Sequence, residues 1–117
     1  MLYEQKFLLS LLLTLIAEVP VVFVLVRYIY KYKNIGISTI IFVGILASVL
    51  TLPYLWFVLP AFVSNRTLYI ILGETLVILV EAIIYYKLLK LKPLDAFIIS
   101  LIANIVSIIL GLLLQIH

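Results

Sequence analysis

Three glutamates, Glu18, Glu74 and Glu81, lie within stretches of otherwise apolar residues. A charged side chain at the centre of a membrane-spanning helix costs roughly 2.5 to 3.5 kcal/mol on insertion scales, so an acid found there marks a candidate functional site. A buried carboxyl group can hold a proton or attract a cation. Glu18 and Glu74 are the leading candidates for such a proton or cation site, and we expect both to face the interior of a helical bundle.

Glu81 belongs to a second tier of candidates. It follows Glu74 by seven residues, which places both acids on one helical face. It also lies nearer the end of its apolar stretch, where Arg27 or Lys31 is expected to come within reach. The simpler interpretation of Glu81 is therefore an ion pair near the membrane interface, with Arg27 or Lys31 as its partner.

Small and polar residues recur every three or four positions in two other apolar stretches. This spacing puts them on one helical face, and small residues let membrane helices approach closely. Ser48 and Thr51 belong to one stripe, and Asn104 and Ser107 to the other. We expect both stripes to face the acids, which adds these four residues to the candidate site. The alternative is that these groups only hold helices together. Intramembrane hydrogen bonds stabilise by about 0.6 kcal/mol on average, which is less than the cost of placing a charged acid in the membrane.

The elements that must position these residues are membrane-spanning helices. Hydrophobic residues make up 68% of the 117 residues and charged residues only 11%, which leaves too little polar surface for a soluble globule. A bilayer needs about 20 apolar residues per helix. Four such runs are present, at 7–26, 37–59, 68–85 and 96–116. The sequence predicts an all-α membrane protein with a single four-helix domain over residues 1–117.

The two halves of the chain, 7–59 and 63–116, resemble each other at an offset of 56 residues. That offset pairs Glu18 with Glu74, Ser48 with Asn104, and Thr51 with Ser107. Two apolar segments also align passably by chance, and that alternative stays open. A true duplication predicts two parallel-repeat helical hairpins, related by an axis along the membrane normal.

Basic residues are distributed asymmetrically between the two sides of the predicted bundle. Six of them follow the first and third spans, and only two flank the opposite side: Arg27, Lys31, Lys33, Lys87, Lys90 and Lys92, against Lys6 and Arg66. Because short cytoplasmic loops are enriched in lysine and arginine, we expect a multi-pass protein of the cell membrane with both hairpin loops cytoplasmic and both termini outside.

Aromatic and acidic residues give two further expectations about helix ends. Five tyrosines follow the first and third spans and are expected to form an interfacial belt: Tyr28, Tyr30, Tyr32, Tyr85 and Tyr86. Asp95, two residues after Pro93, is the expected N-cap of the fourth span.

Motifs for enzymatic catalysis and for metal binding are lacking in the sequence. It holds no cysteine, no paired metal-binding histidines and no glycine-rich phosphate loop, and its one histidine is the final residue, His117. We therefore expect no enzymatic activity, no metal and no cofactor. The net charge of +3 follows the membrane topology and does not indicate binding to nucleic acid.

Two segments carry a resemblance to other proteins. They are Thr51-Leu52-Pro53-Tyr54-Leu55-Trp56-Phe57 and the run from Ser100 to Ser107, which Gly111 follows. Together with the acids in spans 1 and 3, they resemble the small four-span integral membrane proteins of prokaryotes that have no assigned function. The resemblance implies the four-helix architecture and brings no activity, ligand or site residue with it.

Two functions fit these observations. The leading hypothesis is a proton- or cation-handling transport component, oligomeric because four short helices enclose little volume. The alternative is a non-catalytic subunit or scaffold, whose polar residues specify packing with a membrane-protein partner. Water or an ion between the acids would favour transport, and acids bonded to neighbouring helices in a dry core would favour the scaffold.

The predicted topology can be tested directly because the chain has no native cysteine. A cysteine introduced at Lys33 and one introduced at Asn65 should react with a membrane-impermeant thiol reagent from opposite sides. The measurement is labelling of intact cells and of inverted vesicles. Labelling of both positions from the same side would rule out this topology.

Overall fold

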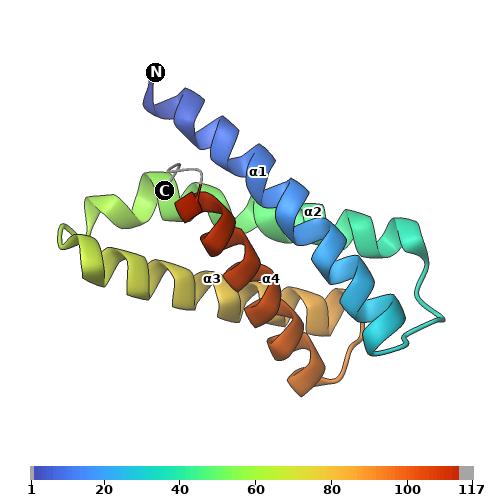
Figure 1. Ribbon diagram of the computed structural model, residues 1–117. Coiled ribbons are helices and arrows are strands. Elements are labelled where there is room, and N and C mark those ends of the chain that lie inside the picture. Colours follow the sequence, from blue (N-terminus) through green and yellow to red (C-terminus); the bar gives the residue numbers. More distant parts are fainter. Residues whose placement is uncertain (1, 114–117) are drawn as a thin grey trace.

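The computed structural model describes residues 2–113 and contains four long helices (Figure 1). Helix α1 (Tyr3–Val24) continues into a π-helical turn, η1 (Leu25–Ile29). Helix α2 (Ile37–Pro53) continues into a second π-helical turn, η2 (Tyr54–Val58), and a 3-10 turn, η3 (Leu59–Ala61). Helices α3 (Arg66–Leu88) and α4 (Pro93–Leu113) complete the chain. The end of the span predicted at 96–116, and His117, lie outside the described residues.

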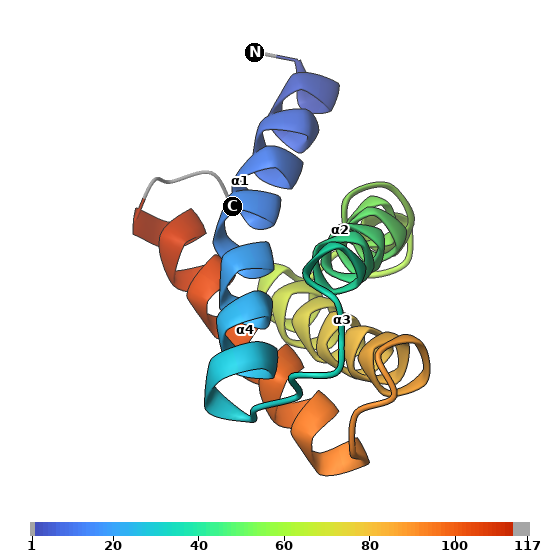
Figure 2. The ribbon, with the colours of Figure 1, turned by 90° about the vertical axis from the view of Figure 1, so that its right-hand side faces the viewer.

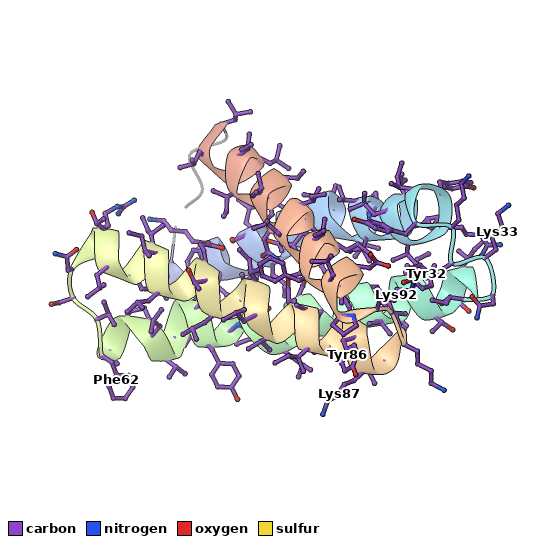
Figure 3. All side chains as sticks on the ribbon, turned by 90° about the horizontal axis from the view of Figure 1, so that it is seen from below. Tyr32, Lys33, Phe62, Tyr86, Lys87 and Lys92 are labelled. Atoms are coloured by element: carbon purple, nitrogen blue, oxygen red, sulfur yellow. The ribbon has the colours of Figure 1, made fainter. Side chains whose placement is uncertain are left out.

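All four helical segments are long and apolar enough to cross a bilayer. They contain 21 to 27 residues with mean hydropathy from 2.1 to 2.6, against the roughly 20 apolar residues that a hydrocarbon core requires. Large apolar side chains cover much of their outer surface (Figure 3). A water-exposed surface of this kind is rare in soluble proteins, whereas lipid accepts it. The four predicted helices are thus present, and they suit a multi-pass membrane protein.

The helices pack as a ring in which each one contacts two others. Helix α1 packs on α2 and α4, and α3 packs on the same two helices. Seen from the side, α2 lies along α3, whereas α4 crosses α3 steeply (Figures 1 and 3). The end view separates the α1–α4 pair from the α2–α3 pair (Figure 2). The interior therefore receives side chains from all four helices.

Local sequence explains where several helices begin. The Asn65 side chain caps α3, because its Oδ1 accepts a hydrogen bond from the Leu68 backbone N–H at 3.0 Å. Helix α4 starts at Pro93, whose missing N–H is no loss at the first helical position. Asp95 is consequently in the first turn, so the prediction that it is the N-cap is wrong. Its carboxylate instead accepts a hydrogen bond from the Tyr32 hydroxyl, which joins the first hairpin loop to the start of α4.

Two lysines end the first and third helical segments in the left-handed backbone conformation. The φ angle is 61° at Lys31 and 57° at Lys90. Such a residue just beyond a helix reverses the chain direction. The two lysines are 59 positions apart, so these helix ends do not follow the offset of 56 that relates the acids.

In the first loop, burial raises the pKa of the Tyr32 phenol, and its hydrogen bond to Asp95 acts in the same direction.

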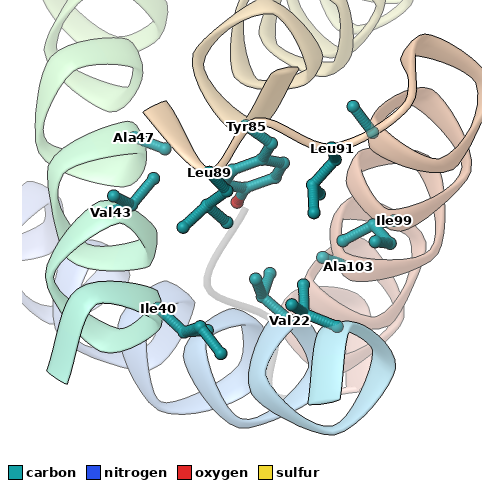
Figure 4. Packing of buried hydrophobic residues seen from close by; sticks show 11 residues of the cluster. Val22, Ile40, Val43, Ala47, Tyr85, Leu89, Leu91, Ile99 and Ala103 are labelled. Atoms are coloured by element: carbon teal, nitrogen blue, oxygen red, sulfur yellow. The ribbon is translucent and has the colours of Figure 1, made fainter. Parts of the chain in front are cut away.

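The apolar core is divided into two clusters. The larger one lies toward the two hairpin loops (Figure 4): Val22, Val26, Ile40, Val43, Ala47, Tyr85, Leu89, Leu91, Ala96, Ile99 and Ala103. The smaller one, Leu52, Leu55 and Val77, lies toward the α2–α3 connection. Tyr85 is fully buried in the larger cluster, so the prediction that it belongs to an interfacial belt is wrong. It is one turn from Glu81, and the inward face of α3 carries both.

The close contact between α1 and α2 gives a test of the packing. A methyl group at Gly44 in α2 would lie 3.4 Å from Val19 Cγ2 in α1, at the limit of ordinary contact. Gly44→Ala should therefore leave stability nearly unchanged. Gly44→Leu should lower the free energy of unfolding by about 1 to 3 kcal/mol, the usual range for overpacking.

The measurement is unfolding of the detergent-solubilised protein monitored by circular dichroism. Phe42→Leu is a matched control, because Phe42 is exposed on the same helix. Equal stabilities of the Gly44→Leu and Gly44→Ala variants would contradict this α1–α2 contact.

Candidate functional site

A layer of buried polar side chains separates the two apolar clusters. Every helix contributes to this polar layer, and its members are Ser10, Thr14, Glu18, Ser48, Thr51, Glu81, Ser100, Asn104 and Ser107. Along α2, for example, Ala47 belongs to the larger cluster, Ser48 and Thr51 to the polar layer, and Leu52 to the smaller cluster. The polar layer thus lies across the middle of the bundle, where lipid offers no hydrogen-bond partner.

Glu81 is the hydrogen-bonding centre of the polar layer. Its side chain is 1% exposed. Asn104 Nδ2 in α4 donates to Glu81 Oε1 at 2.7 Å, and Thr51 Oγ1 in α2 lies 3.1 Å from Glu81 Oε2 as a donor. Asn104 also donates to the Ser100 carbonyl at 2.8 Å, which fixes its amide orientation. One carboxyl group therefore connects three helices.

The expected ion pair between Glu81 and Arg27 is not what the structure contains. Arg27 Nη1 donates to the Ile35 backbone carbonyl at 3.1 Å, within the first hairpin loop. Lys31 is exposed in the same loop. The phase of α3 turns Glu81 toward the bundle interior, where Asn104 and Thr51 donate to it. The sequence distance to the helix end suggested the interface, but burial is decided by helix rotation.

Glu18 is the second acid at the centre of the polar layer. It is 3% exposed, and its carboxyl group lies within hydrogen-bonding reach of the Glu81 carboxyl and the Ser107 hydroxyl. Its Oε1 atom is buried and has no hydrogen-bond partner within residues 2–113. The two acids that meet at the centre are thus Glu18 from α1 and Glu81 from α3.

Glu74 occupies a different position from the one that the 56-residue offset suggested. It is half-buried, two helical turns from Glu81, and lines the same narrow cavity as Glu18 and Glu81. The cavity is small: the centre of a water-sized sphere can move within about 10 Å³. That is close to the minimum for one water molecule. Glu74 therefore lines the cavity and is not the hydrogen-bonded partner of Glu18.

The four residues of the two polar stripes are all buried, but they make different hydrogen-bond contacts. Thr51 and Asn104 bind Glu81, whereas Ser107 Oγ lies 3.5 Å from Thr14 Oγ1, at the edge of hydrogen-bonding distance. Ser48 Oγ has no hydrogen-bond partner. The sequence predicts contacts from Asn104 and Ser48 to Glu18 and Glu74. The structure gives the Asn104 contact to Glu81 instead.

Sequence patterns missed two members of the site. Thr14 lines the cavity, and Tyr85 places its buried hydroxyl near Glu81 and Glu18 without a hydrogen-bond partner. A signal for both was present. Thr14 precedes Glu18 by four residues and Tyr85 follows Glu81 by four, so each shares the inward face of its acid.

Among residues 2–113, no group of three or more His, Cys, Asp or Glu side chains is placed to hold a metal ion. Comparisons with protein families, with curated proteins and with solved structures found no match to this chain. The site itself contains two buried carboxyl groups, one half-buried carboxyl group and neutral hydrogen-bond donors.

The link between Glu81 and Asn104 can be measured by a double-mutant cycle. Asn104→Val leaves Glu81 Oε1 without its closest donor and should destabilise the fold by about 1 to 3 kcal/mol. In a Glu81→Leu background the same change should matter much less. The coupling energy is expected to be roughly 0.6 to 1.7 kcal/mol, the average and maximum measured for membrane proteins.

The cycle is measured by unfolding in mixed detergent micelles. Ile105→Val is the matched control, because Ile105 neighbours Asn104 but is exposed. Additive effects of Asn104→Val and Glu81→Leu would contradict the contact.

Proposed function

We propose that this chain is a polytopic integral membrane protein that handles a proton or a cation, as a component of membrane transport. The observation that carries the proposal is the meeting of two buried carboxyl groups, Glu18 and Glu81, in the middle of a four-helix bundle. They come from different helices, so a change in helix packing alters their separation. This coupling of charge state to helix packing is what a transport cycle needs.

The energetics favour a function over simple helix adhesion. A hydrogen bond between membrane helices stabilises by about 0.6 kcal/mol on average, whereas a central charge costs roughly 2.5 to 3.5 kcal/mol. Asn or Ser at positions 18 and 81 would supply hydrogen bonds at a smaller desolvation cost. Two acids are useful where ionisation itself matters.

Access to the acid pair is different at its two ends. The cavity beside the pair is lined by Glu74, which is half-buried and so reaches partly out of the interior. On the other side, the larger apolar cluster covers Tyr85 with Leu89 and Leu91 (Figure 4). We propose that protons or cations reach the pair past Glu74, and that the apolar cluster closes the opposite path.

The topology and the repeat are part of the same proposal. Lys33 and Lys92 gather at the end of the molecule opposite Phe62 (Figure 3), which supports cytoplasmic hairpin loops, outside termini and a place in the cell membrane. Ser48 and Asn104, and likewise Thr51 and Ser107, are buried pairs at the 56-residue offset, which supports an origin from two parallel hairpins. The acid pair itself breaks that symmetry.

We further propose that the protein works as a homo-oligomer or with a membrane-protein partner. An open apolar groove of about 600 Å³ runs between α2 and α3, and Leu50, Leu76, Val80 and Ile84 are among its lining residues. A helix of a second copy would fill it by van der Waals contact, the force that joins helices in lipid. The lipid bilayer is the other partner, and the proposal involves no nucleic acid, no cofactor and no enzymatic step.

A scaffold role is the alternative, and one observation favours it. Glu81, Thr51 and Asn104 tie three helices together through direct hydrogen bonds, which a packing role also requires. In that case the acids would serve assembly with a partner and no ion would cross the membrane.

Ion flux in reconstituted vesicles separates the two functions. Glu→Gln keeps the shape and most hydrogen bonds of the side chain but removes its ionisation. Glu18→Gln and Glu81→Gln should reduce proton or cation flux to the level of empty vesicles, because no titrating pair remains. Glu74→Gln should slow the flux without abolishing it, because Glu74 lines the access cavity only.

Glu4→Gln is the matched control, since Glu4 is exposed at the start of α1 and outside the site. It should retain the flux of the unmodified protein. The absence of flux of protons, sodium or potassium through the unmodified protein would overturn the transport proposal and favour the scaffold.

A further inference from the structure

We propose that Glu18 and Glu81 hold a single proton between them, that the proton resides on Glu18, and that the site is built for a proton and not for a metal cation. This inference deepens the proposed function by naming the ion. It is carried by the hydrogen-bond partners of each carboxyl oxygen and by the space beside the pair.

The two carboxyl groups cannot both be ionised where they are. Each is at least 97% buried, and they lie within hydrogen-bonding reach of each other. An isolated charge in an apolar medium is costly, and two like charges in contact add their repulsion. Two carboxylates also lack any hydrogen for a bond between them. One proton between the acids removes the repulsion and makes that bond.

The partners of the oxygens show which acid carries the proton. Both oxygens of Glu81 face donors, Asn104 Nδ2 and Thr51 Oγ1, as an ionised carboxylate requires. Glu18 Oε1 is buried with no hydrogen-bond partner. An unpartnered oxygen is tolerable on a neutral carboxylic acid and costly on an anion. Glu18 is therefore the neutral acid, and its O–H donates to Glu81.

The Thr51 hydroxyl can respond when the proton moves. Its oxygen lies 2.8 Å from the Ala47 carbonyl and 3.1 Å from Glu81 Oε2, yet it carries one hydrogen. With the proton on Glu18, Thr51 donates to Glu81. If the proton passes to Glu81 Oε2, Thr51 turns to donate to the Ala47 carbonyl, and the new O–H still lies between the two acids. Every hydrogen keeps an acceptor in both states, but Glu18 then carries the charge while its Oε1 lacks a partner among the described residues, so the proton favours Glu18.

A metal cation fits this site poorly. Hard cations such as Ca²⁺ take six to eight oxygen ligands, and Mg²⁺ keeps several waters. The cavity beside the pair offers about 10 Å³, enough for one water at most. Asn104 presents its NH₂ group to the site, which is a donor and would repel a cation.

The other titratable groups that face the pair are few. Within residues 2–113, α3 contributes Glu74 and Tyr85, and no cationic side chain contributes to the surroundings of either acid. Helices α2 and α4 present only neutral groups, such as Thr51 and Asn104. A lysine or arginine beside the pair would stabilise two carboxylates, so the lack of one among the described residues favours retention of the proton.

Infrared difference spectroscopy of the protein in lipid at neutral pH tests this inference. The unmodified protein should show the carbonyl stretch of a protonated carboxylic acid. In a Glu74→Gln background, which removes the half-buried carboxyl group, Glu18→Gln should abolish that band, because Glu81 keeps its donors and stays ionised. Glu81→Gln should keep the band and shift it, because Glu18 stays protonated and donates to an amide. Glu74→Gln should leave the shared-proton band in place.

The comparison with salts tests the choice of ion. Sodium or potassium chloride in large excess should leave the band unchanged, whereas a cation site would release the proton and lose the band. Loss of the band in salt would overturn proton selectivity and leave a cation-transport role standing. Loss in Glu81→Gln with retention in Glu18→Gln would overturn the assignment to Glu18.

Each variant is first compared with the unmodified protein by circular dichroism and thermal unfolding. If Glu18→Gln does not fold, the Glu81→Gln variant decides, with glutamate carrying an isotope-labelled carboxyl group and with Glu4→Gln and Glu74→Gln excluding those two acids as the source. A shifted band that persists in Glu81→Gln then belongs to Glu18. An unmodified protein with no protonated carboxyl band would overturn the inference. A shared proton in a protein that passes no ions would instead overturn the transport function alone.

Discussion

The absence of water from a hydrocarbon core is the constraint on which this structure depends. Each polar group inside the bilayer must find its partner within the protein. Glu81 meets that requirement with donors from α2 and α4. Glu18 lies within reach of Glu81, but its Oε1 is left without a partner among residues 2–113. The acids thereby fix how the four helices are rotated, since each must present its polar face to the same layer.

The apolar clusters on either side of the polar layer have a different role. In lipid they gain little from hiding apolar area, so they stabilise the bundle by close contact. Ala47 and Ala103 lie in the larger cluster, and Gly44 lets α2 approach Val19 of α1. Close packing at this end also buries Tyr85, one helical turn from Glu81.

The comparison of the halves of the chain shows how far sequence similarity reaches. The 56-residue offset relates Glu18 to Glu74, and both do line one cavity. The acids in hydrogen-bonding reach are nevertheless Glu18 and Glu81, which that offset does not relate. The left-handed lysines that end the first and third helical segments, Lys31 and Lys90, are 59 positions apart. Helix ends and crossing geometry thus changed which groups meet, even where residue types correspond.

The sequence by itself determined the four helices and the small polar stripes, because apolar length and a repeat of three or four residues are local properties of a chain. It also placed Thr51 and Asn104 among the site candidates. The tertiary structure alone decided that Glu81 is central, that Glu74 is a cavity wall, and that Tyr85 is buried. These outcomes depend on the rotation and crossing of each helix against its neighbours, which residue spacing within one helix does not contain.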